Sequence, residues 1–112
     1  AEFQRLNGVL DRWCETERRD PATIERNENV SFHMAANAAA LGRSEQHFRE
    51  TWGPAADMFR SRGVVLGTPD QAIDLVGRYR DAGAARVNIA IRPPVDWEAL
   101  HAWSEEVIPA FR

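Results

Sequence analysis

Two residues, His33 and Arg92, have side chains suited to catalysis or to anion binding, and each lies near the end of a stretch of alternating polarity. An imidazole titrates near neutral pH, so His33 can donate a proton or hold an anionic oxygen. The Arg92 guanidinium can fork onto a carboxylate or a phosphate. Each also has a plainer interpretation: His33 as a histidine satisfied by polar neighbours, and Arg92 as a surface ion-pair residue. Asn37 is a further pocket candidate or, alternatively, a turn residue.

The other reactive side chains favour structural roles. His33, His47 and His101 lack a short metal-ligand spacing, and Cys14 is the single cysteine, so no metal site is predicted. Cys14 lies on the apolar stripe of an expected helix, which favours packing over nucleophilic chemistry. We expect His47 and His101 to face solvent, and the four tryptophans to pack in the core.

Alternating polar and apolar residues over 28–34 and 86–92 predict two strands that carry these candidates. Apolar residues at helical spacing predict four helical stretches around them, over 1–19, 44–62, 68–83 and 96–111. Gly53-Pro54 is expected to break the second stretch. Thr68 and Gln71 form a capping box at the start of the third, and this box uses amides that could otherwise bind a phosphate.

Length and charge restrict the classes of function. A chain of 112 residues, 44% hydrophobic, is expected to form one domain or part of one, over 1–112. The formal charge of −3 gives no electrostatic basis for binding nucleic acid or an anionic membrane. The apolar stretches are short and no signal segment is recognisable, so we expect a cytoplasmic protein. All 14 basic residues are arginines, which excludes Schiff-base lysine chemistry.

Two strands separated by long helical stretches predict an α/β fold with parallel strands joined by right-handed crossovers. Two parallel strands alone would leave open edges, because a parallel sheet normally has neighbours on each side and helices on both faces. The chain is therefore expected to be a piece of a larger sheet.

Three segments resemble one known family, by their order and spacing together. They are Arg18–Arg26 after the helix bearing Trp13-Cys14, the run Gly67–Gln71 followed by Tyr79 and Asp81–Gly83, and the closing segment Trp103–Arg112. Together they resemble the carboxyl-terminal part of the bacterial-luciferase-like monooxygenase superfamily, which includes deazaflavin-dependent oxidoreductases.

The resemblance implies a partial (β/α) TIM-type barrel, about its last quarter, with two parallel strands and flanking helices. It implies an oxidoreductase that uses FMN or the deazaflavin coenzyme F-420 for hydride transfer or monooxygenation of a small organic substrate. The arginine-only basic composition favours deazaflavin. The chain alone is expected to be inactive, since the earlier barrel strands have no counterpart in it.

In such a barrel the active site lies at the carboxyl ends of the strands. Strand parity then directs one set of side chains toward the helices, namely Val30, Phe32, Met34, Val87, Ile89 and Ile91. The other set faces the barrel interior, namely Asn29, Ser31, His33, Asn88, Ala90 and Arg92. The resemblance thus makes His33 the expected catalytic residue, with Arg92, Asn37 and Asn88 binding cofactor or substrate.

Expected partners are a flavin-type cofactor, a small-molecule substrate, and either further copies of the chain or the missing part of the barrel. The alternative is a non-catalytic module that pairs its open strands with a partner chain and dimerises.

Overall fold

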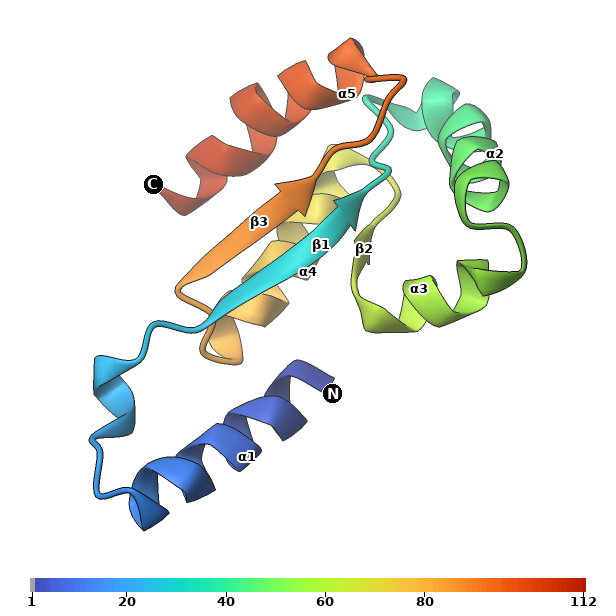
Figure 1. The fold of residues 1–112 in the computed structure, drawn as a ribbon. Coiled ribbons are helices and arrows are strands. Elements are labelled where there is room, and N and C mark those ends of the chain that lie inside the picture. The colour runs from blue at the N-terminus through green and yellow to red at the C-terminus, as the bar shows by residue number, and fades with distance from the viewer. Residues whose placement is uncertain (1) are drawn as a thin grey trace.

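The computed structural model describes residues 2–112 and shows an α/β fold in which three parallel strands alternate with helices (Figure 1). The elements follow in the order α1 (Glu2–Thr16), β1 (Asn27–Phe32), α2 (Leu41–Trp52), α3 (Ala56–Arg62), β2 (Val64–Val65), α4 (Pro69–Asp81), β3 (Arg86–Ala90) and α5 (Trp97–Ala102). A π-helical turn, Trp103–Val107, and a 3-10 turn, Ile108–Phe111, continue α5 to the end of the chain.

The strands lie in the order β2-β1-β3, and both pairings are parallel. The prediction of parallel strands is therefore confirmed, but the prediction of only two strands is wrong. β2 has two residues, too few to show the alternation that identifies a strand in a sequence. Its pairing with β1 extends past both strands, because His33 N donates to Val65 O and Ala35 N donates to Gly67 O, each at 2.8 Å.

The chain moves from β1 to β2 through α2 and α3, and then reverses direction across the sheet, passing β1 to reach β3 through α4. The helix α4 and the helical segment 97–111 cover one face of the sheet (Figure 1). On the other face, α2 meets only the carboxyl end of β1, where its Phe48 ring lies 5.2 Å from His33 between centroids, and Asn29 and Asn88 are exposed.

The main core forms where α4 and the segment 97–111 meet the sheet. Its buried members are Val30, Met34, Val65, Ala72, Ala102, Trp103 and Val107. A second, smaller core joins α2, α3 and β2 through buried Phe48, Ala56 and Val64. The two cores lie on either side of β1, so adjacent side chains at its end enter different environments.

The predicted strand parity is confirmed over most of its length. Val30 and Met34 are buried and Val87 and Ile89 are half-buried against the main core, as expected of helix-facing positions. Ile91 was also predicted to face the helices, and this is wrong because its side chain is 44% exposed. The physical reason is that β3 ends at Ala90, so the alternation of a strand no longer applies to Ile91.

The expected helix boundaries are largely present. Gln71 Oε1 accepts from Thr68 N at 2.9 Å, and Asp96 Oδ1 accepts from Ala99 N at 3.1 Å, so both predicted caps form. The predicted break follows Trp52, where Gly53 has a positive φ of 51°. That break makes Trp52 the last residue of α2.

The first helix, α1, buries fewer of its apolar side chains than the sequence predicts. Phe3 and Cys14 are buried, and the Phe3 ring meets Tyr79 of α4 edge-on at 5.7 Å between centroids. Leu6 and Trp13, expected on the same stripe, are exposed. None of the helices between Glu2 and Arg112 combines the length and the apolar character needed to cross a lipid bilayer.

Candidate functional site

A cavity of about 380 Å³ lies at the carboxyl ends of β1 and β3, next to the place where the strand order reverses. Ligands of open α/β sheets and of (β/α) barrels both bind at the carboxyl ends of strands. The end of β1, the segment after β3, the first turns of α2 and the start of α5 supply its lining. The lining side chains that matter for chemistry are His33, Arg43, His47, Arg92, Asp96 and Glu98.

His33 is the most enclosed polar side chain of this cavity, with 6% of its surface exposed. Its Nε2 accepts a hydrogen bond from Nε1 of Trp52 at 3.1 Å. Its Nδ1 is buried and has no hydrogen-bond partner among residues 2–112. Buried polar atoms are nearly always paired, so this nitrogen marks a position where a partner is missing.

Burial, together with repulsion of like charge from the nearby His47 and Arg92, lowers the pKa of His33 to about 4. The imidazole is therefore neutral at pH 7. A neutral imidazole has one donor nitrogen and one acceptor nitrogen. Because Nε2 accepts from Trp52, the proton lies on Nδ1, so His33, which lines the cavity, carries a buried N–H donor.

Aromatic rings hold His33 in this position. The imidazole lies 5.2 Å from Phe48 and 5.4 Å from His47, measured between ring centroids. Trp52 stacks on Phe59 of α3 at 3.8 Å, and the Arg92 guanidinium carbon lies 4.6 Å from the Trp52 ring centre. Arg92 and His33 thus both contact the indole of Trp52. The ends of the two predicted strands therefore lie close together, as expected.

The cavity has unpaired cationic side chains. Within residues 2–112, neither Arg43 nor Arg92 forms an ion pair or a hydrogen bond through its guanidinium. Of the two carboxylates at the rim, Asp96 already accepts the Ala99 amide as a helix cap. A ligand with anionic or carbonyl oxygens would therefore find several donors here.

Two of the predicted site residues lie outside the cavity lining. Asn37 Oδ1 accepts from Ala40 N at 3.2 Å, which caps a short 3-10 turn and matches the alternative interpretation as a turn residue. Asn88 lies on the uncovered face of the sheet, where its Nδ2 donates to Asn29 Oδ1 at 2.9 Å. The structure therefore brings His33 and Arg92 together and leaves both asparagines apart from them.

Three residues of the site were missed by sequence reasoning. His47 was expected to face solvent, but it is half-buried and lines the cavity with Arg43. A signal for this pair exists, because residues four apart share one face of a helix. Trp52 gave no such signal, since nothing in the sequence distinguishes an indole that binds His33 from one that only packs.

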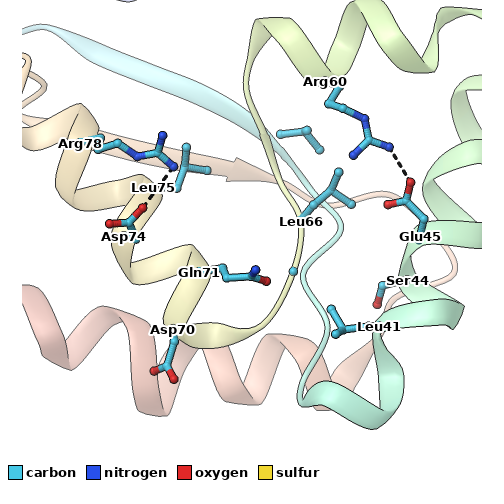
Figure 2. Close-up of a pocket in the computed structure, with 12 residues that line it drawn as sticks. Leu41, Ser44, Glu45, Arg60, Leu66, Asp70, Gln71, Asp74, Leu75 and Arg78 are labelled. Carbon is cyan, nitrogen blue, oxygen red and sulfur yellow. Dashed lines mark hydrogen bonds and ion pairs between the residues drawn. The ribbon is translucent and has the colours of Figure 1, made fainter.

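A separate groove runs between α4 and the α2–α3 pair, and Figure 2 shows its lining. Its charged side chains already pair with each other, Arg60 with Glu45 and Arg78 with Asp74. Its arginines are therefore less free to bind an anion than those of the His33 cavity. No cluster of three or more potential metal ligands occurs in the described part of the chain.

Searches of protein-family models, of curated proteins and of solved structures found no match to this chain. Because one fold hosts many functions, the site and the sequence motifs carry the functional assignment of this chain.

Proposed function

We propose that the chain is the carboxyl-terminal part of a luciferase-like (β/α) barrel oxidoreductase, and that the cavity beside His33 binds an oxygen-bearing group of its flavin-type cofactor or substrate. One observation carries the proposal. The buried Nδ1–H of His33 lacks an acceptor, and His33 lines the same cavity as two arginines, Arg43 and Arg92, that form no ion pair among residues 2–112.

The arrangement of the sheet supports the barrel. β1 and β3 are adjacent parallel strands, as neighbouring barrel strands would be, and the pairing with β2 begins only at Ser31. The stretch 27–30 of β1 therefore keeps one edge free for an earlier barrel strand. Asn29, Asn88 and Ala90 are exposed on one face, which in a barrel would be the interior closed by the other strands.

The donors present fit such a cofactor, because FMN and coenzyme F-420 both carry ring carbonyls and phosphate oxygens. The bound cofactor would supply the hydride or oxygen chemistry. His33 would donate its Nδ1–H to a carbonyl or anionic oxygen, remaining neutral at pH 7. Arg43 and Arg92 would balance negative charge and orient the group, and the apolar side chains of Phe32 and Met34 would limit water.

A fluorescence titration of the chain with FMN and, separately, with coenzyme F-420 tests this proposal. We expect binding that Arg92→Ala weakens about tenfold, the loss of one charge-assisted contact. Arg80→Ala, which removes an arginine from α4 outside this cavity, is the matched control. If neither cofactor binds to this chain or to a longer polypeptide that supplies the earlier strands, the oxidoreductase proposal is wrong.

The free strand edges favour a second candidate, a non-catalytic module that pairs with another copy of the chain. β3 ends the sheet on one side, and the exposed face carries the hydrogen-bonded pair Asn29 and Asn88, beside Arg86, whose charge is partnered by Glu25 at 3.7 Å. Light scattering on a size-exclusion column decides this. A mass of twice 12.7 kDa without flavin binding supports the module, and a monomer contradicts it.

A further inference from the structure

We propose that Trp52 is a positioning residue: its indole N–H occupies Nε2 of His33, holds the His33 proton on Nδ1, and so requires that any ligand group that reaches Nδ1 accept a hydrogen bond. The assignment of the tautomer stands on geometry within the chain. Only the consequence for a ligand rests on the function proposed above.

The hydrogen bond itself assigns the proton. An indole nitrogen is a donor only, so Nε1 of Trp52, 3.1 Å from Nε2 of His33, requires that Nε2 be the acceptor. The second ring nitrogen must then carry the hydrogen if the imidazole is neutral. Two groups face His33 with positive or potentially positive charge, His47 from α2 and Arg92 from the end of β3, and both oppose a second proton on the ring.

Neighbouring side chains fix the orientation of Trp52. It is the last residue of α2, and the break at Gly53 turns the chain into α3, whose Phe59 stacks on the indole at 3.8 Å and 28°. The Arg92 guanidinium also packs against the ring. Phe59 and Arg92 contact the faces of the Trp52 indole, so the ring edge that carries the N–H remains free to point at His33.

This arrangement has a consequence for specificity. With Nε2 occupied, the unpaired Nδ1 of His33 is a donor, so a ligand group that reaches it must offer an acceptor such as a carbonyl, carboxylate or phosphate oxygen. A ligand group that offers only N–H donors would leave a buried donor unpaired, which costs far more than a missing methyl contact. Trp52 thus acts on the ligand through His33 without touching it.

Long-range proton–nitrogen NMR correlation of the unliganded chain at pH 7 tests the tautomer directly, because protonated and unprotonated ring nitrogens differ widely in shift. We expect His33 to carry its proton on Nδ1. In Trp52→Phe, which keeps an aromatic ring against Phe59 and Arg92 but removes the N–H, we expect the Nε2-protonated form to appear. Trp97→Phe is the matched control, since Trp97 lines the same cavity and donates no hydrogen bond to His33.

A proton on Nε2 in the unmodified chain overturns the proposal, as does an unchanged tautomer in folded Trp52→Phe. If that variant does not fold, the unmodified chain supplies the second test. As the pH is lowered through the pKa of His33, the chemical shift of the Trp52 indole N–H must then change over the same pH range as the shifts of the His33 ring. The reason is that protonated Nε2 can no longer accept the hydrogen bond. Independent movement of the two resonances contradicts the proposal.

Ligand binding separates this inference from the proposed function. If FMN or coenzyme F-420 binds, we expect Trp52→Phe to weaken it by up to about tenfold, the size of one hydrogen bond, and Trp97→Phe to do so less. If neither cofactor binds but the tautomer changes as expected, the proposed function fails and the role of Trp52 stands. If Trp52→Phe and the unmodified chain bind the cofactor with equal affinity, Trp52 has no influence on ligand binding and that part of the inference is wrong.

Discussion

The Arg92 guanidinium carbon lies 4.6 Å from the centre of the Trp52 ring, so the segment after β3 is joined to the end of α2 through a cation–π contact. The same indole donates to His33 at the end of β1. Three segments that are 19 to 59 residues apart therefore converge on one side chain. Arg92 is exposed, and its charge remains available to the cavity.

Removal of the Arg92 charge is expected to raise the pKa of His33. Arg92 is one of the causes that lower this pKa, after burial and His47, so Arg92→Ala should shift the titration toward neutral pH. Arg92→Lys keeps the charge and should change the pKa less. NMR titration of the His33 ring protons measures both, and an equal pKa in all three chains contradicts the electrostatic account.

The buried His33 should make the chain less stable in acid. Its pKa is about 4 in the folded chain against an ordinary value of 6.5, so the unfolded chain binds this proton first as the pH falls. The free energy of unfolding begins to fall near pH 6.5 as the pH is lowered, and the contribution of His33 is fully lost below pH 4. The total decrease is about 3 kcal/mol. Urea unfolding at several pH values measures it.

The control for this prediction is His33→Gln, which should flatten that part of the pH dependence. Comparison of the two chains cancels contributions from other groups, such as Glu28, whose pKa burial raises. His101→Gln, at an exposed position of α5, is the matched control for the substitution of a histidine by glutamine. Identical profiles for His33→Gln and the unmodified chain would show that His33 is not buried in neutral form.

Two glycine substitutions should have opposite effects on stability. Gly63, just before β2, has a φ of +114°, and a Cβ there would lie 2.9 Å from the Tyr79 hydroxyl, so Gly63→Ala should cost about 1–3 kcal/mol. Gly42 lies in the first turn of α2 with open space around it, and Gly42→Ala should stabilise the chain by up to about 0.5–1 kcal/mol. Thermal melts of both variants provide the measurement. A neutral Gly63→Ala would contradict the close packing of Tyr79 against this turn.

Truncation of Phe48 tests the smaller core that supports the site. The ring is fully buried between α2 and the end of β1, so Phe48→Ala should cost about 3–5 kcal/mol of unfolding free energy. Leu6→Ala, at an exposed position of α1, should change it by less than about 0.5 kcal/mol. Chemical denaturation gives both values, and similar losses in the two variants would contradict the placement of α2 over His33.

Local patterns in the sequence determined the helices, the two longer strands and the positions of His33 and Arg92 near the ends of those strands. Alternation placed Val30 and Met34 in the core and directed His33 to the opposite face, because side chains of a strand alternate whatever surrounds it. The Thr68 capping box and the break at Gly53 follow equally from short-range chemistry. These features depend on residues a few positions apart, so a sequence reveals them.

Only the tertiary structure decided how the site is completed. β2 became a strand because β1 offered it hydrogen-bond partners, not because two valines specify one. Trp52, His47 and Arg43 joined the site because the crossover from β1 to β2 lays α2 over His33, a relationship between distant segments that no local pattern encodes. The protonation of His33 follows from the same packing, since burial and the indole N–H, rather than the residue type, set which nitrogen carries its proton.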